Sequence, residues 1–303
     1  MGHSVTLQIL DYPGVQKFAQ WGIKDQLDYA NAQAENLGST LFTTEIAPQP
    51  NGRPGVIVFP PALSFDPPKL PSGWQDRLVE LHRSGTVLAS VCSGAFLLAE
   101  TGLLDGRRVT THWRHSAVFH RTHPSAIIDT DRLLVDLGSI VTAGGVMAWT
   151  DLTLHMIERI AGRKLMLDVA RMFVLDPPDR EQSYYATFTP DTKHADIQIL
   201  AVQNQLQTNL KTRHTVADLA QIGRMSERSL LRRFKKATGM TPVAYLQLLR
   251  IEAARSRLEL TLDSFERISW DVGYGDAATF RRIFKRIVGL TPADYRRRFG
   301  PNA

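Results

Sequence analysis

The stretch RRFKKATGMTPVAYLQ (residues 232–247) decides the fold of the C-terminal third of this chain, because it recurs as RIFKRIVGLTPADYRR (282–297), 50 residues later. Upstream, LAQIGRMS (219–226) matches ISWDVGYG (268–275) at an offset of 49, and one extra residue near Asp276 accounts for the difference. A repeat of this kind indicates that one structural unit is used twice. The best matched positions are Phe234 and Phe284, Lys235 and Lys285, Gly239 and Gly289, Thr241-Pro242 and Thr291-Pro292, and Tyr245 and Tyr295.

The first copy has the sequence signals of a helix, a tight turn and a second helix. Thr215 and Asp218 have the spacing of a capping box and are predicted to begin a short helix. Ser226 is predicted to cap the second helix, because its hydroxyl can accept a hydrogen bond from a free amide of the first turn. On that helix an apolar face carries Leu230, Phe234 and Ala237, and a basic face carries Arg228, Arg232, Lys235 and Lys236.

The second copy repeats this design. Asp263 and Glu266 are predicted as its capping box, and Asp276 is predicted as the cap of its second helix. On that helix the residues expected to point inward are Phe280, Phe284 and Ile287, and those expected to point outward are Arg281, Arg282, Lys285 and Arg286.

Residues 242–259 predict one continuous helix between the two copies. A proline follows a threonine cap at 241–242 and again at 291–292, at the helix position where its missing N–H costs nothing. Such a helix is about 27 Å long. It can hold the second helix of each copy in successive turns of the major groove, which are about 34 Å apart. A helical bundle with a solvated basic face is the alternative. Two capped repeats that each have a basic second helix favour double-stranded DNA as the partner.

Composition divides the chain in the same way. A length of 303 residues suggests about two domains. Residues 201–303 carry 19 Lys and Arg against 9 Asp and Glu, a net charge of +10, whereas the first 200 residues carry 17 against 21, a net charge of −4. We therefore expect one domain for a polyanion and another for a different task. The absence of a long apolar run or signal peptide and the single cysteine predict a cytoplasmic protein without a membrane partner.

The N-terminal part alternates short apolar runs with helical patterns, which predicts an α/β layered domain with a parallel sheet. Expected strands are 5–10, 40–46, 55–59 and 86–91, a hairpin is expected at 133–143, and expected helices are 15–33, 74–84, 94–103, 146–160 and 164–175. The stretch 176–192 is rich in Pro, Asp, Ser and Gln and breaks both periodicities. We therefore divide the chain into a domain at 1–178, a linker at 179–193 and an all-helical domain at 194–303.

Residues 195–299 resemble the AraC/XylS family of bacterial transcription regulators, with a pattern of the type GxxxxxFxRxFKxxxGxTPxxYxxxxR in both halves. The resemblance implies two helix-turn-helix units that read adjacent major-groove segments. The first turn departs from the family pattern, because Arg224 stands where glycine is more common. A non-glycine residue at this position predicts a left-handed backbone or a shifted turn. The implied base-facing residues are Arg228, Leu231, Arg232, Ala278, Thr279 and Arg282, and the expected phosphate contacts are Ser226, Arg281 and Lys285.

The stretch VCSGAFLLAETGLLDGRRVTTHW (91–113) resembles the GlxA-type AraC regulators, in which a PfpI-like (class I glutamine amidotransferase-like) domain precedes the DNA-binding module. Three further stretches, 12–16, 142–158 and 167–174, follow in the order of the same architecture. The resemblance therefore implies a flavodoxin-like α/β layered sandwich at the N-terminus and an all-α double helix-turn-helix domain at the C-terminus.

Cys92 lies in SVCSGA (90–95), between a strand-like run and a helix-like run, as a nucleophile does on a sharp turn. In the resembled superfamily this residue can act as a nucleophile when partners support it. Here Ser93 replaces the histidine of proteolytic members, no carboxylate appears in 13–22, and Pro60 and Pro61 lack the N–H of an oxyanion donor. We therefore predict no catalytic residue. Cys92 then contacts a ligand, senses oxidation or is an inert buried residue.

Four histidines lie close together in HWRHSAVFHRTH (112–123). Their spacings of three, five and three do not place all four on one helical face, and the stretch contains no carboxylate or second cysteine. We predict no metal site and no cofactor, with metal binding by His112, His115, His120 and His123 as the alternative. The resemblance explains His112 as part of its TTHW stretch.

Together these features predict a sequence-specific DNA-binding regulator whose α/β domain binds a small-molecule effector, associates into a homodimer, or both. The expected pocket lies at the carboxyl ends of the strands. Its expected residues are Pro13, Gly14, Pro60, Pro61, Cys92 and Ser93. The rival hypotheses are a PfpI-like cysteine hydrolase, amidase or glyoxalase that uses Cys92, and an architectural DNA-binding protein. The sequence discloses neither the effector, nor the operator, nor whether the protein activates or represses.

Overall fold

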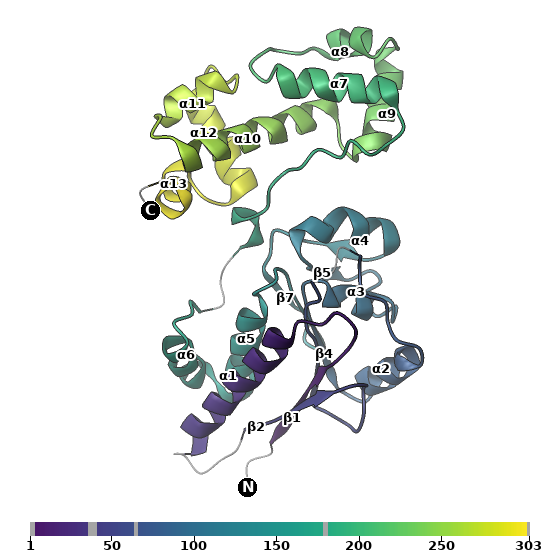
Figure 1. Cartoon of the computed structure of the whole chain (residues 1–303), viewed down its shortest axis with the longest axis vertical. Coiled ribbons are helices and arrows are strands. Elements are labelled where there is room, and N and C mark those ends of the chain that lie inside the picture. The colour runs from purple at the N-terminus through teal and green to yellow at the C-terminus, as the bar shows by residue number, and fades with distance from the viewer. Residues whose placement is uncertain (1–3, 36–40, 64–65, 178–180, 302–303) are drawn as a thin grey trace. The chain divides into compact units, whose positions relative to one another are not determined.

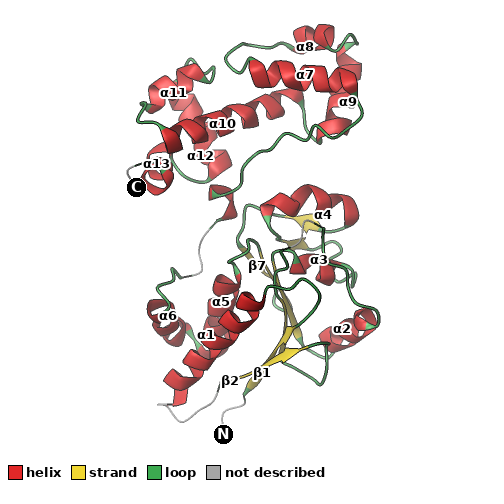
Figure 2. Cartoon of the chain, in the orientation of Figure 1, coloured by secondary structure: helices red, strands yellow, loops and turns green. Residues whose placement is uncertain are grey.

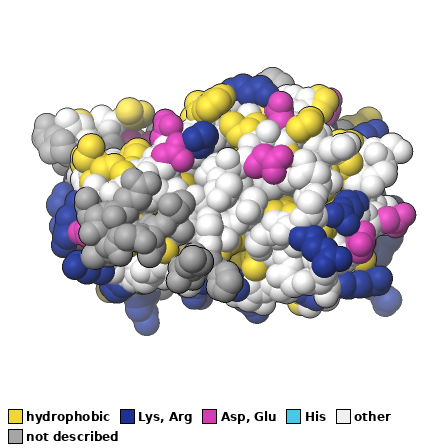
Figure 3. Space-filling view, turned by 90° about the horizontal axis from the view of Figure 1, so that it is seen from below, with side chains coloured by type: hydrophobic (Ala, Val, Ile, Leu, Met, Phe, Trp, Pro, Cys, Tyr) yellow, Lys and Arg dark blue, Asp and Glu magenta, His cyan; other side chains and the backbone are white. Residues whose placement is uncertain are grey.

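The computed structural model describes residues 4–35, 41–63, 66–177 and 181–301. It divides into two compact units, Met1–Ser183 and Tyr184–Ala303. Figures 1 and 2 show a sheet with helices on both faces in the first unit and helices alone in the second. Charges of both signs are interspersed on the face of the molecule drawn in Figure 3.

The first unit is built on a six-stranded sheet of order β2-β1-β3-β4-β8-β7. Its strands are β1 (Val5–Leu10), β2 (Phe42–Ala47), β3 (Val56–Phe59), β4 (Val87–Val91), β7 (Leu134–Asp136) and β8 (Ile140–Ala143). All neighbours run parallel except β7, which pairs antiparallel with β8 as the predicted hairpin. β3 is buried along its whole length, because helices cover both faces of a parallel sheet. A separate two-stranded sheet joins β5 (Arg108–Val109) to β6 (Ile127–Ile128).

Helices cover the two faces of this sheet and form two apolar cores. One core contains residues of α1 (Lys17–Glu35), α5 (Trp149–Ala161) and α6 (Arg163–Met172). The other contains residues of α2 (Trp74–Arg83), α3 (Gly94–Ala99) and α4 (Ser116–Thr122). α3 is shorter than the predicted helix at 94–103, because the chain turns at Gly102, which has a φ of 77°. The predicted strands and the other helices are present, with their ends shifted by a few residues.

The second unit is helical throughout its described residues. Its helices are α7 (Ile197–Thr208), α8 (Val216–Ile222), α9 (Glu227–Thr238), α10 (Pro242–Leu260), α11 (Phe265–Asp271), α12 (Ala277–Val288) and α13 (Pro292–Phe299). One core gathers α7, α8 and α9, the other gathers α11, α12 and α13, and α10 contributes to both. The repeat therefore folds as two helix-turn-helix units on one shared helix.

Most of the predicted caps are present. Thr215 and Asp218 form the reciprocal capping box of α8, Ser226 caps α9, and Asp276 caps α12 with two backbone hydrogen bonds of 3.0 Å. Threonine caps precede the first proline of α10 and of α13, as predicted.

The predicted capping box of α11 is wrong. The cap is Ser264, whose Oγ accepts a hydrogen bond from the Arg267 amide at 3.2 Å. Asp263 accepts a hydrogen bond from Arg257 of α10 instead, and Glu266 forms an ion pair with Arg281. Sequence spacing alone could not reveal these competing partners, because both lie on other helices.

Candidate functional site

The outer face of α9 carries the residues predicted to contact DNA in the first repeat. Arg228, Leu231 and Arg232 are all exposed, while Leu230 and Phe234 on the opposite face are buried. The cap residue Ser226 is also exposed, at the helix end where backbone N–H groups favour an anion. The outer face of α9 therefore exposes two guanidinium groups to solvent, and the cap residue at its N-terminus is polar and exposed.

The outer face of α12 carries the second predicted set. Ala278, Arg281, Arg282 and Lys285 are exposed, and Thr279 is half-buried. The Thr279 hydroxyl accepts a hydrogen bond from Arg282 Nη2 at 3.0 Å. Arg281 Nη2 lies 3.0 Å from Glu266 Oε1, and its guanidinium lies over the Phe265 ring at 5.6 Å. Arg281 and Arg282 of α12 therefore have intramolecular partners in the DNA-free protein.

Arg233 has a different role from its neighbours in the basic run, which sequence analysis missed. Its Nε and Nη2 atoms donate to the two carboxylate oxygens of Asp196 at 2.9 and 2.6 Å, and Nη1 donates to Gln198 at 2.5 Å. These hydrogen bonds lower the pKa of Asp196, which also caps α7. The repeat contained a signal, because the position equivalent to Arg233 in the second copy is the apolar Ile283. This contact fixes α9 against α7.

The turn between α8 and α9 contains the predicted left-handed residue. Arg224 has a φ of 49°, while Gly223 before it has an ordinary φ of −74°. A non-glycine residue in this conformation costs about 1–2 kcal/mol. The Arg224 amide nevertheless donates to Gln221 O at 3.0 Å, so the turn keeps its hydrogen bond.

Arg224→Gly is expected to raise the free energy of unfolding by about 0.5–1 kcal/mol, because glycine removes the strain but adds some unfolded-state entropy. Denaturant unfolding followed by circular dichroism measures the change. Arg228→Gly, the same replacement inside α9, is the matched control and is expected to lower stability by about 1 kcal/mol. A loss of stability in Arg224→Gly would contradict the expectation.

Cys92 occupies the turn between β4 and α3, as predicted, with a φ of 55°. Its thiol is buried, with 2% of the residue exposed. The Cys92 amide donates to Ala143 O, and the Thr111 hydroxyl donates to Cys92 O, both at 2.7 Å. Burial raises the pKa of the Cys92 thiol to about 11, and hydrogen bonds from Ser93 only partly offset this. At neutral pH the residue is therefore a protonated thiol, which is a poor nucleophile.

The pH dependence of Cys92 alkylation tests this. Between about pH 7 and 10 the rate with iodoacetamide is expected to rise about tenfold for each pH unit, because the thiolate fraction grows by that factor below the pKa. The protein unfolded in guanidinium chloride is the control, and its rate should level off above about pH 9.5, one unit above the pKa of a free thiol. A plateau near neutral pH in the folded protein would show a thiolate instead.

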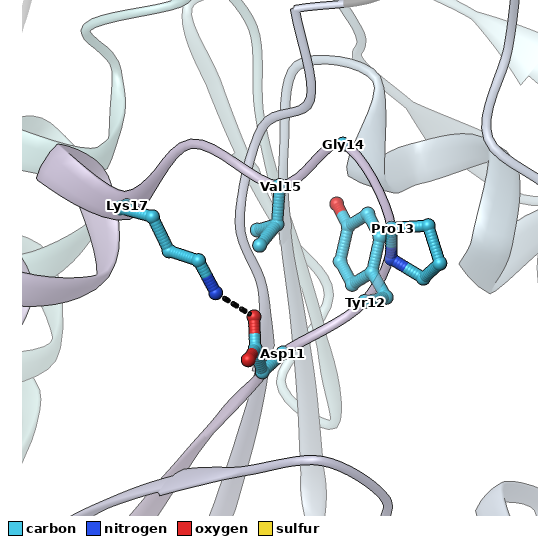
Figure 4. A pocket seen from close by; sticks show the side chains of 6 residues that line it. All are labelled: Asp11, Tyr12, Pro13, Gly14, Val15 and Lys17. Atoms are coloured by element: carbon cyan, nitrogen blue, oxygen red, sulfur yellow. Dashed lines mark hydrogen bonds and ion pairs between the residues drawn. The ribbon is translucent and has the colours of Figure 1, made fainter.

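A hollow of about 380 Å³ opens at the carboxyl end of β1 (Figure 4). It is lined by Asp11, Tyr12, Pro13, Gly14, Val15 and Lys17. Pro13 and Gly14 were predicted as pocket residues. The other four predicted residues are buried next to it rather than in its lining. Pro60 and Pro61 are connected to it, because the Tyr12 hydroxyl donates to Pro60 O and the Gln16 backbone amide donates to Pro61 O at 2.8 Å.

The hollow contains charged residues that sequence analysis did not include. Figure 4 shows the Lys17 amino group directed at the Asp11 carboxylate, and this ion pair lowers the pKa of Asp11. Gln16 lies between the lining residues Val15 and Lys17 in the sequence and is 6% exposed. Its side-chain amide forms no hydrogen bond among the described residues. The position of Asp11, directly after a predicted strand, was the signal that could have identified it.

The four histidines of residues 112–123 do not come together at one point. The His112 and His115 rings lie 5.8 Å apart, and burial lowers the pKa of His112 to about 4. His112 Nδ1 accepts a hydrogen bond from the Arg114 amide. Across the residues that the structure describes, no group of three or more His, Cys, Asp or Glu side chains is arranged to hold a metal ion. Over the same residues, no helix is both long enough and apolar enough to cross a bilayer.

Fold and surface together define a protein class in which an α/β unit with a pocket is joined to a pair of basic helix-turn-helix units. Two families match the corresponding parts of the chain. The DJ-1/PfpI family matches residues 69–159, and a helix-turn-helix domain matches residues 219–298. Among solved structures, Drosophila melanogaster DJ-1beta covers 57% of this chain and 100% of its own, with 18% identity and a TM-score of 0.45.

Sequence relatives contain both parts in one chain. The HTH-type transcriptional regulator Rv1931c of Mycobacterium tuberculosis is 32% identical over 231 residues, which are 71% of this chain and 85% of that protein. GlxA of Rhizobium meliloti is 29% identical, over 76% of this chain and 73% of that protein. GbdR of Pseudomonas aeruginosa is also 29% identical, but the match spans only 58% of its length. The chain belongs to the family of AraC-type transcriptional regulators with an N-terminal DJ-1/PfpI domain.

Proposed function

We propose that this protein is a regulator that binds double-stranded DNA with sequence specificity, inserting α9 and α12 into adjacent major-groove segments. The observation that carries the proposal is the pair of capped basic helices held on the single helix α10. α10 has 19 residues and is therefore about 28 Å long, close to the roughly 34 Å repeat of the groove. Family membership supports the same function.

The exposed side chains divide into base contacts and phosphate contacts. We assign Arg232 and Arg282 to guanine O6 and N7, and Leu231, Ala278 and the Thr279 methyl to thymine methyl groups. Arg228 is a third base-facing arginine. Ser226, Arg281 and Lys285 are assigned to phosphates, which orient the protein without reading sequence. Arg281 exchanges Glu266 for a phosphate when DNA binds.

Selection from a random duplex library tests this function. The full chain is expected to enrich a two-part sequence with its halves about one helical turn apart, and the affinity for it should fall steeply with salt. Affinity that depends on salt but selects no sequence would instead indicate an architectural protein. The absence of DNA binding would contradict the proposal altogether.

The first unit is proposed to bind a small molecule in the hollow at Asp11 and Lys17. The side-chain amide of Gln16 is buried without a hydrogen-bond partner among the described residues, which costs about 1–3 kcal/mol and leaves its polar atoms available to a ligand. The proposal includes a homodimer in the cytoplasm. It includes no enzymatic activity, because the Cys92 thiol is buried and Pro60 and Pro61 lack the N–H of an oxyanion donor. Cys92→Ala is expected to leave DNA binding intact. Turnover of an amide or aldehyde substrate that Cys92→Ala abolishes would favour the cysteine hydrolase.

A further inference from the structure

The chain leaves the first unit through a buried glutamine. Gln182 begins the short helix Gln182–Tyr184 and is 2% exposed. All of its side-chain polar groups are hydrogen-bonded inside the first unit. Its Nε2 donates to Thr111 O at 2.9 Å, to Arg132 O at 3.0 Å and to Thr110 Oγ1 at 3.1 Å, and its Oε1 accepts from the Trp113 amide at 3.3 Å.

A single residue, Thr111, connects the Gln182 amide to the Cys92 turn. Thr111 accepts from Gln182 through its carbonyl oxygen and donates to Cys92 O through its hydroxyl. Cys92 in turn donates to Ala143, and the next residue, Gly144, leaves the space that Gln182 fills. A Cβ atom at Gly144 would lie 1.8 Å from Gln182 Nε2. The position of Gln182 therefore depends on the backbone on both sides of the turn.

A few residues after Gln182, the chain is bound to α10 of the second unit. The Ala186 carbonyl oxygen accepts a hydrogen bond from Arg255 of α10, a side chain that is 3% exposed. The Phe188 ring packs against Tyr245 of the same helix with centroids 5.2 Å apart. Three residues separate Gln182 from Ala186, so the chain between the two anchors spans at most about 14 Å. The connector between these two anchors is therefore short.

We propose that Gln182 is a positioning residue that couples the Cys92 turn to the spacer helix α10. The Gln182 amide is either hydrogen-bonded to Thr111 and Arg132 or released from them. A ligand that shifts the Cys92 turn, or DNA that shifts α10, favours one of these two states, and the short connector passes the change to the other unit. The coupling is reciprocal, so DNA bound to the second unit changes the state of the Cys92 turn. This inference rests on the proposed function, because it requires a duplex that the protein binds.

The alkylation rate of Cys92 reports on the turn, and the label is unambiguous because the chain contains one cysteine. The full chain is treated with iodoacetamide at a fixed, mildly alkaline pH, with and without a saturating duplex from the library selection. In the wild-type protein the duplex is expected to change the rate about fivefold or more, the lower end of typical coupling between sites. An unchanged rate would overturn the inference.

Two variants displace the glutamine in different ways. Gln182→Ala removes the amide, and Gly144→Ala adds a methyl group where only the end of a flexible side chain must move. Both are expected to change the affinity for the duplex by no more than about the factor of the coupling, and to lose the effect of the duplex on the alkylation rate. Gln182→Glu should behave likewise despite its equal size, because its carboxylate would face the carbonyl oxygens of Thr111 and Arg132.

Gln26→Ala is the matched control, since Gln26 is a glutamine of the same unit with 1% exposure on α1. It should retain the wild-type response. A full response in folded Gln182→Ala and Gln182→Glu would show that the connector does not carry the coupling. Failure to select any duplex would contradict the proposed function, whereas a selected duplex without a Gln182-dependent response contradicts only this inference.

Discussion

Replacing Arg232 and Arg282 by alanine is expected to weaken binding to the selected duplex by about 1–3 kcal/mol for each residue, or about 5- to 150-fold in Kd. Each guanidinium is exposed on the outer face of a recognition helix, α9 or α12. Because α9 and α12 are proposed to contact separate half-sites, the double variant should lose the sum of the single losses. Binding to duplexes with single base changes measures which position each arginine reads.

The matched control is Arg297→Ala, which removes one positive charge from α13, where Arg297 pairs with Asp294 at 2.7 Å. It should lower affinity less than either variant and alter no base preference. Each recognition-helix variant should relax preference at one position only, in its own half-site. Unchanged affinity in both Arg232→Ala and Arg282→Ala would show that these helices do not face the DNA.

Phe284→Ala is expected to lower the stability of the second repeat by about 3–5 kcal/mol, because it empties the centre of an aromatic core. The ring is fully buried, and its centroid lies 5.6 Å from Tyr295, 6.1 Å from Phe265 and 6.5 Å from Phe280. A loss of this size is a large part of the stability of an ordinary domain. DNA affinity should fall too, since Phe284 holds α12 in place.

Denaturant unfolding of the full chain followed by circular dichroism, together with duplex binding, measures both effects. Leu262→Ala is the control in the same repeat, because Leu262 is 72% exposed and its removal should change stability by less than about 0.5 kcal/mol. Similar stability losses in the two variants would mean that the core of α11, α12 and α13 is not organised around Phe284.

Local signals made much of the fold predictable. The capping residues Thr215, Ser226 and Asp276 act on amides within three residues of themselves, so their effect can be read from adjacent sequence. The internal repeat supported the helix-turn-helix pattern with a second copy, although the capping box predicted for α11 was wrong. The apolar runs of the sheet were predictable for a similar reason, since burial on both faces leaves no alternation.

The missed residues act across long stretches of sequence. Arg233 reaches Asp196 from 37 positions away, and Gln182 bonds to residues about 70 positions earlier. Asp263 could not be assigned correctly, because an arginine on α10 competes with the amides that it was expected to cap. Spacing rules describe only neighbours, so such tertiary contacts were outside their reach.

The shared helix α10 makes the two repeats inseparable. It contributes Tyr245 to the first core, and Ile251 and Leu258 to the second. A chain cut inside this helix would leave both cores open to water, so neither repeat is a module that can be moved alone. The smallest fragment expected to keep both cores closed to water is therefore the whole second unit.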